Sequence, residues 1–188
     1  MKGPPMFERN IAYFCAPALA GIKPGNLVSL QKADFPDVHD RISRLNETLG
    51  KVGICADILC ECEKRVLLFV YRPILLESYL ERADIRKLLS RYGYDPDFTL
   101  TRKIAHLKER MTEKDFPHEI GAFLGYPTED IKGFIRYHGK GCVLCGEWKV
   151  YGDPAKAKVL FARYKKCRKA LLSRVEEGKS LVQIFCAA

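Results

Sequence analysis

Two adjacent strand-like runs constrain the fold of this chain more than any other feature of its sequence. Residues 52–58 place apolar side chains at every second position, which is the period of a half-buried strand. Residues 66–71 are apolar on both faces, as expected of a central strand. Residues 60–65 between them supply a connecting turn. We therefore predict an early β-hairpin, and its apolar faces must be covered by the rest of the chain.

Helical patterns surround this hairpin and supply the cover. Segments with apolar residues at helical spacing are residues 39–49, 73–80, 84–92, 97–111, 118–124 and 128–137. The clearest helix begins at Pro154, has one apolar stripe and ends before Gly178. Short strands are predicted at residues 27–30 and 148–151. This order predicts an α+β fold, in which a small sheet is packed by several helices including a long C-terminal one.

The chain is expected to form one domain over residues 1–188, because its length suits one domain and no shift in composition marks a boundary. Residues 1–10 are predicted to be a loose lead-in. Residues 11–20 are apolar, but Pro17 requires a helix there to start or end, and the match to a signal peptide is poor. We therefore predict a cytoplasmic protein. No apolar run approaches the roughly 20 residues that cross a bilayer, so no membrane association is predicted.

The charge balance favours anionic partners. The chain has 32 basic and 23 acidic residues, which give a net charge of +9. A basic surface attracts nucleic acid, anionic small molecules or an acidic protein. Because the basic residues are spread along the chain, a well-solvated surface explains the same composition.

Cysteine pairs indicate a first kind of chemistry. Cys142 and Cys145 form a Cys-x-x-Cys pair in a glycine-rich loop, where a turn brings both sulfur atoms to one side for a metal or a redox disulfide. Cys60 and Cys62 form a second close pair at the hairpin turn. If the two pairs met, four thiolates would hold zinc or an iron–sulfur cluster. Buried free cysteines are the alternative.

A cysteine nucleophile is a second hypothesis. Cys15 precedes an apolar segment, and His118 and Glu119 lie far away in the sequence, as is usual for a Cys–His pair. In that reading His118 accepts the thiol proton and Glu119 orients the imidazole ring. The alternative places Cys15 in the core and His118 at the start of a helix.

Residues 118–138 outline a helix-turn-helix, with Gly125 at the turn. Residues 128–137 would be the recognition helix. The basic residues that would face phosphate or base edges are Lys132, Arg136 and His138. Glu129 and Asp130 in the first turn oppose this reading, because phosphate repels carboxylate. A helical hairpin with a purely structural role is the alternative.

The single tryptophan, Trp148, is followed by Lys149. An exposed indole beside a cation would bind a planar or anionic small molecule. A strand anchored in the core explains the same pair of residues.

Three stretches together resemble a known family. They are CAPALAGIK at residues 15–23, FPHEIGAFLGYP at residues 116–127 and CGEWKVY at residues 145–151. With three residues of the last long helix, they resemble the bacterial domain of unknown function family 3793, found mostly in anaerobic Firmicutes. Those three residues are Phe161, Tyr164 and Cys167. The resemblance covers nearly the whole chain.

The resemblance implies no particular activity. It implies redox or iron physiology, since members of the family lie near flavodoxin or iron-uptake genes. The family pattern includes Cys15, Cys145, Cys167 and the His118–Glu119 pair. It does not include Cys60, Cys62 or Cys142.

These observations predict an intracellular thiol-bearing accessory protein linked to redox or iron metabolism in anaerobes, with iron or zinc as the metal. The partner would be an anionic small molecule or a protein of redox or iron metabolism. The alternatives are a nucleic-acid-binding regulator that uses residues 118–138 and a structural or interaction protein without a catalytic site. Whether the protein is an enzyme stays open. The candidate residues are Cys15, His118 and Glu119 for catalysis, Trp148 and Lys149 for ligand binding, and Cys142 and Cys145 for metal binding.

Overall fold

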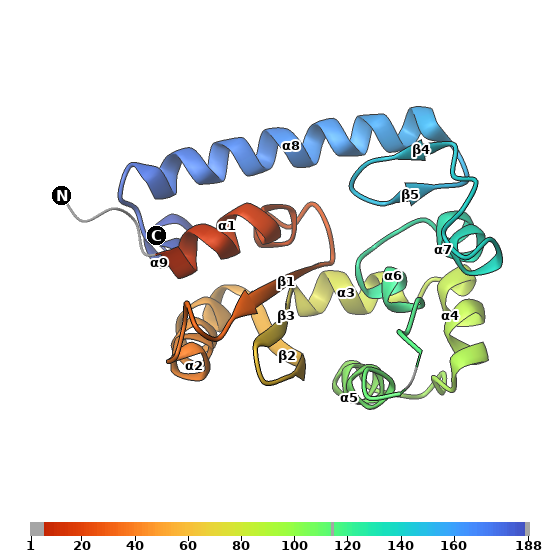
Figure 1. Cartoon of the computed structure of the whole chain (residues 1–188), viewed down its shortest axis with the longest axis horizontal. Helices are drawn as coiled ribbons and strands as arrows, with labels where there is room; N and C mark the ends of the chain where they lie inside the picture. The colour runs from red at the N-terminus through yellow and green to blue at the C-terminus, as the bar shows by residue number, and fades with distance from the viewer. Residues whose placement is uncertain (1–5, 114, 187–188) are drawn as a thin grey trace. The chain divides into compact units, whose positions relative to one another are not determined.

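The computed structural model describes residues 6–113 and 115–186 (Figure 1). Internal contacts divide the chain into two compact units. The first unit contains the described residues up to Ile74 and those from Tyr164 onward, and the second is Leu75–Arg163. Helices α3 (Pro73–Leu80) and α8 (Pro154–Glu176) each contribute residues to both units. A single domain over residues 1–188 stays a prediction.

The first unit is built on a three-stranded antiparallel sheet with the order β1-β3-β2. Its strands are β1 (Gly25–Gln31), β2 (Cys55–Glu61) and β3 (Arg65–Tyr71). Strands β2 and β3 form the predicted hairpin, and β3 is the central strand, as its continuous apolar run indicates. The pairing register shifts between Ile58 and Cys60, just before the turn.

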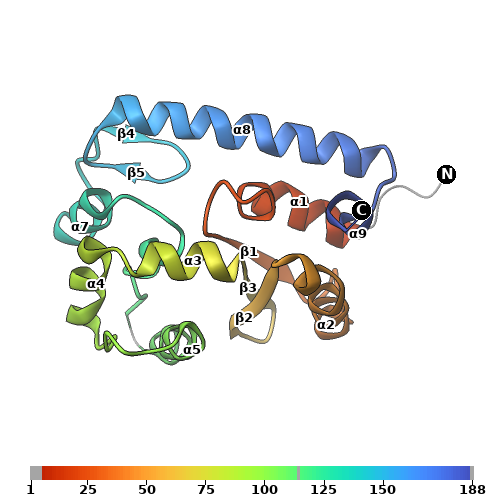
Figure 2. The ribbon, with the colours of Figure 1, turned by 180° about the vertical axis from the view of Figure 1, so that it is seen from behind.

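Helices α1 (Met6–Leu19) and α2 (Val38–Leu49) pack on one face of this sheet, followed by the 3₁₀ turn η1 (Gly50–Val52). The C-terminal half of α8 and the short helix α9 (Leu181–Phe185) complete the unit (Figure 2). The buried core combines side chains from the sheet with those from the helices. They include Val28, Leu30, Leu68 and Val70 from the sheet, Ile11 and Cys15 from α1, Ile42 and Leu49 from α2, and Val175 from α8.

The prediction of a loose lead-in over residues 1–10 is wrong for residues 6–10, which form the first turns of α1. Phe7 is only 4% exposed, and its ring meets Phe35 edge-on with the ring centroids 5.6 Å apart. Burial of this aromatic ring holds the start of the helix against the loop that follows β1. Residues 1–5 of the predicted lead-in lie outside the described residues.

Helix α1 also continues through Pro17, where the sequence predicts that a helix starts or ends. Proline has no N–H, so the carbonyl oxygen of Tyr13 loses its usual helical donor. The Nε atom of Arg168 donates to that oxygen at 2.8 Å. At the end of the helix, the guanidinium of Arg72 donates to the carbonyl oxygen of Leu19 at 2.6 and 3.2 Å. Two arginines distant in sequence therefore supply the donors that an apolar, proline-containing helix lacks.

The second unit is mainly helical. Besides parts of α3 and α8 it contains α4 (Ala83–Leu89), the 3₁₀ turn η2 (Ser90–Tyr92), α5 (Leu100–Arg110), α6 (Ile120–Phe123) and α7 (Thr128–Arg136). Two short antiparallel strands, β4 (Leu144–Cys145) and β5 (Lys149–Val150), form a hairpin. The two units together confirm the predicted α+β fold with a small sheet and a long C-terminal helix. In the described part of the chain, no helix is long and apolar enough to cross a membrane.

Candidate functional site

Cys15 lies on the inner face of α1 and is 0% exposed. Burial raises the pKa of its thiol to about 12, although the nearby Lys23 acts in the opposite direction. At neutral pH the thiol is therefore protonated, and it packs as part of the apolar core of the first unit. Its predicted partner His118 belongs to the second unit, and their pairing stays a prediction.

Glu119 is fully buried and forms a salt bridge with Arg110. Both Nε and Nη2 of Arg110 donate to the Glu119 carboxylate, the second at 3.5 Å. The ring of His118 is exposed and packs near Phe116 and Phe134, with ring centroids 5.9 and 5.0 Å away. Glu119 therefore anchors the segment before α6 to α5, a role that needs the distant Arg110 and that local sequence does not indicate.

Trp148 is buried and its indole is held on three sides. Its Nε1 donates to the Asp130 carboxylate at 2.7 Å, its ring stacks on Tyr126, and Phe161 meets it edge-on. The Nζ atom of Lys149 donates to the carbonyl oxygen of Gly139 at 2.7 Å. These contacts match the alternative reading of the Trp-Lys pair, in which the strand is anchored in the core.

Asp130 connects α7 to the β4–β5 hairpin. It is 3% exposed, and its second carboxylate oxygen accepts the backbone N–H groups of Tyr151 at 2.7 Å and Gly152 at 2.8 Å. Together with the Trp148 indole, this one carboxylate satisfies three donors of the hairpin. An acidic residue in the first turn of α7 is therefore required by packing within the unit.

Helices α6 and α7 occupy the places that the helix-turn-helix reading predicts. The first turn of α7, where base contacts are usually made, is covered by its own unit. Thr128 is buried and its hydroxyl donates to the Asp84 carboxylate, and Asp130 binds the hairpin. The exposed basic residues lie farther along and beyond the helix; they are Lys132, Arg136 and His138.

Cys142 and Cys145 lie at the β4–β5 hairpin of the second unit, with Cys145 exposed and paired in register with Lys149. Cys60 and Cys62 belong to the first unit. Among residues 6–113 and 115–186, no three His, Cys, Asp or Glu side chains lie close enough together to hold a metal ion. Because the four cysteines are divided between the two units, the four-thiolate zinc or iron–sulfur centre stays a prediction.

Cys62 occupies the first position of the turn that joins β2 to β3. Its own N–H donates to the carbonyl oxygen of Arg65 at 2.9 Å, which closes the turn. The backbone N–H groups of Lys64 and Arg65, which follow it in the turn, favour its thiolate and, helped by the charges of Lys32 and Arg65, lower the pKa of the thiol. The side chain is exposed to solvent. Cys62 therefore takes the position that Asp, Asn or Ser usually takes when its side chain caps a turn.

Cys60 differs from its neighbour. Burial, followed by the nearby Cys62, raises the pKa of the Cys60 thiol. Burial also raises the pKa of Cys55 and of Cys167. Cys62 is thus distinguished from these thiols by its exposure and by the direction in which its pKa is shifted. The sequence signal for it was a cysteine at the start of a four-residue turn.

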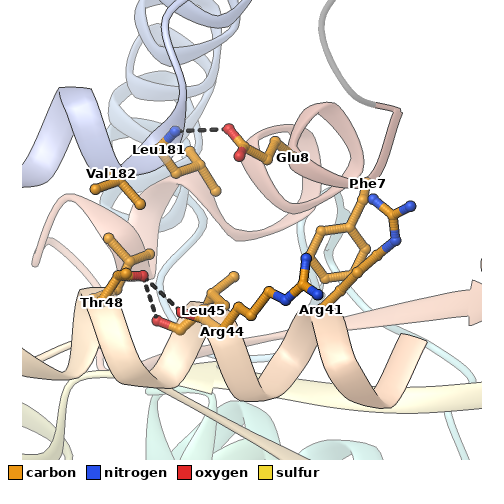
Figure 3. Close-up of a pocket in the computed structure, with 9 residues that line it drawn as sticks. Phe7, Glu8, Arg41, Arg44, Leu45, Thr48, Leu181 and Val182 are labelled. Atoms are coloured by element: carbon orange, nitrogen blue, oxygen red, sulfur yellow. Dashed lines mark hydrogen bonds between the residues drawn. The ribbon is translucent and has the colours of Figure 1, made fainter. Parts of the chain in front are cut away.

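A cleft of about 250 Å³ lies in the first unit among α1, α2 and α9 (Figure 3). Its polar groups are mostly engaged within the unit. The Glu8 carboxylate accepts the N–H of Leu181 at 2.7 Å, Arg41 pairs with Asp37, and the Thr48 hydroxyl donates to carbonyl oxygens of α2. The remaining lining is Arg44 and five apolar residues, which are Phe7, Leu45, Leu49, Leu181 and Val182. Apart from Arg44, the cleft thus offers little directional recognition.

A small antiparallel sheet packed by helices, with thiols on the surface of both units, defines an α+β protein with candidate thiol sites. The chain belongs to the family described as Protein of unknown function (DUF3793), whose model matches residues 11–185. The match confirms the family resemblance seen in the sequence. No curated protein and no solved structure shows a significant match to the chain.

Proposed function

We propose that this protein is a thiol-bearing redox protein whose reactive group is Cys62. The observation that supports this most directly is the β2–β3 turn, where an exposed cysteine is followed by two backbone N–H groups that lower the pKa of its thiol. The thiolate, not the thiol, is the nucleophile in exchange with disulfides. A turn that stabilises the thiolate and leaves it accessible therefore favours this chemistry at neutral pH.

The charges around the turn support the same reading. Lys32 and Arg65 both favour the thiolate form of Cys62. Lys32 also pairs with Glu61 at 2.5 Å, and His39 contacts the same carboxylate oxygen at 3.2 Å. Glu61 thereby holds the Lys32 side chain beside the turn.

The proposed step is a thiol–disulfide exchange. The Cys62 thiolate attacks one sulfur of a low-molecular-weight disulfide, and a new S–S bond forms between that sulfur and Cys62. The original S–S bond breaks, and its other half leaves as a thiolate that takes a proton from water. A second external thiol reverses the reaction, so the protein alternates between a free thiol and a mixed disulfide.

This step can be tested with cystine as the probe disulfide. The reduced full-length protein is mixed with cystine without oxygen, quenched with acid at intervals and mapped by peptide mass spectrometry. We expect the cysteine adduct to form first on Cys62, to be reversed by dithiothreitol and to be lost in Cys62→Ser. Cys145→Ser is the matched control, since it removes another exposed thiol and should leave the rate unchanged. The proposal would be contradicted if the adduct formed first on Cys145. It would also be contradicted if the rate of adduct formation at Cys62 were no higher than in the urea-unfolded protein.

A further inference from the structure

Two exposed aromatic residues of α1 and three exposed lysines of α8 lie on paired helices of the first unit. Helix α1 and the C-terminal half of α8 run antiparallel, as Figures 1 and 2 both show. Three contacts fix this pairing: Arg168 to the Tyr13 carbonyl at 2.8 Å, Cys167 to the Ala16 carbonyl at 3.4 Å, and Arg9 to Glu176 at 3.8 Å. We call the exposed face of this pair the α1–α8 surface; it consists of Tyr13, Phe14, Lys165, Lys166, Arg168 and Lys169.

The aromatic rings of this surface are positioned and yet open to solvent. Tyr13 is 45% exposed and Phe14 is 46% exposed, and the two rings meet edge-on with centroids 4.9 Å apart. The Arg168 guanidinium lies 5.4 Å from the centre of the Tyr13 ring while its Nε binds the Tyr13 carbonyl. The gap left by Pro17 in the hydrogen bonding of the helix therefore places an arginine directly against an exposed aromatic side chain.

The lysines lie on the side of α8 that faces away from the core. Tyr164, Leu171 and Val175 form the buried stripe of this half of the helix. At 100° per residue, the three exposed lysines fall on the opposite side; they are Lys165, Lys166 and Lys169. No carboxylate in the described part of the chain forms an ion pair with any of the three. The one acidic residue of α8, Glu176, is paired with Arg9.

We propose that the α1–α8 surface binds single-stranded nucleic acid. Unstacked bases would stack on Tyr13 and Phe14, and the neighbouring phosphates would pair with the lysines. Exposed aromatic rings beside cations are the means by which proteins bind single strands without reading their sequence, since every base has a face that can stack. In a duplex the bases are already stacked on one another, so the aromatic pair favours single strands. This inference does not depend on Cys62.

The test uses the full-length protein and a fluorescein-labelled thymidine 20-mer, with binding followed by fluorescence anisotropy. We expect the logarithm of the affinity to fall with the logarithm of salt concentration with a slope of about −2, because each of three phosphate contacts contributes roughly −0.7. Changing both aromatic residues, Tyr13→Ala and Phe14→Ala, should weaken binding at least about fivefold, the lower end of the effect of losing one stacked base. The double variant must keep the circular dichroism spectrum of the original protein.

A charge-matched pair of variants separates a defined site from a general basic surface. The triple change Lys165→Gln, Lys166→Gln and Lys169→Gln should bring the salt slope close to zero. The control triple Lys51→Gln, Lys87→Gln and Lys158→Gln removes the same charge elsewhere and should leave the slope near −2. Three results would overturn the proposal. They are an equal loss of affinity in both triple variants, no binding of the oligonucleotide at about 50 mM salt, and binding to phosphatidylserine vesicles without binding to the oligonucleotide. Cys62→Ser should bind like the original protein, so this test and that of the thiol can fail separately.

Discussion

Replacement of Asp130 by alanine tests how the second unit is held together. The change removes a buried carboxylate that accepts hydrogen bonds from the Trp148 indole and from two backbone N–H groups of the hairpin. A buried donor left without an acceptor costs about 1–3 kcal/mol. The indole N–H is buried, whereas the N–H groups of Tyr151 and Gly152 are partly buried and water can reach them. We therefore expect Asp130→Ala to lower the free energy of unfolding by about 3–5 kcal/mol.

Urea denaturation followed by tryptophan fluorescence measures this effect. Trp148 is the single tryptophan of the chain and belongs to the same hydrogen-bonded network, so its emission reports on this unit. Glu129→Ala is the control, because Glu129 is exposed in the same first turn of α7 and its loss removes the same favourable charge, worth about 0.3–1 kcal/mol. The reasoning is refuted if the two variants lose the same free energy to within about 0.5 kcal/mol.

Two further predictions concern a helix interior and the buried thiol. A Cβ atom at Gly133 would lie 2.4 Å from Cγ of Tyr151, so Gly133→Ala should destabilise the protein by about 1–3 kcal/mol. A Cβ atom at Gly50 would meet open space, so Gly50→Ala should stabilise the protein by about 0.5 kcal/mol. Urea denaturation measures both changes. Cys15 has a pKa of about 12, so maleimide at about pH 9 should label it only after unfolding, as mass spectrometry would show. Labelling of Cys15 in the folded protein as fast as that of an exposed cysteine would show that the core position is wrong.

Elements with a local signal could be predicted from the sequence. The β2–β3 hairpin follows from the alternation before residue 60 and the apolar run after residue 65. The long helix α8 follows from Pro154 at its start and Gly178 after its end. Both depend on neighbours within a few residues, which is the range over which periodicity, caps and turns act.

Features that depend on distant partners could not be predicted. Helix α1 passes through Pro17 because Arg168, far along the chain, binds the freed carbonyl oxygen of Tyr13. The sequence allows Glu119 to be an acid that orients a histidine, because nothing in the sequence indicates that Arg110 binds it. The same limit applies to Asp130. From the sequence it is an acidic residue that favours the N-terminus of α7, and its bond to the Trp148 indole is not indicated.

The candidate thiol was only partly predictable. The sequence favours Cys15, which lies in a motif of the family, but the burial of Cys15 on α1 depends on packing against the sheet and α8. Cys62 lies outside that motif, and the two backbone N–H groups that lower its pKa come from the turn that follows it. The preference for Cys62 therefore rests on backbone geometry, which the presence of a cysteine in the sequence does not reveal.

The pH dependence of thiol alkylation tests the central claim most directly. The full-length protein is pulsed with iodoacetamide over a range of pH, and the rate at each cysteine is read by peptide mass spectrometry, with the urea-unfolded protein as reference. Because the folded-state pKa of Cys62 is lowered and that of Cys60 is raised, the midpoint for Cys62 should lie below its unfolded value and that for Cys60 above. Each unit of lowering raises the thiolate fraction at neutral pH about tenfold. A Cys62 midpoint at or above that of the unfolded chain would contradict the proposed reactive thiol.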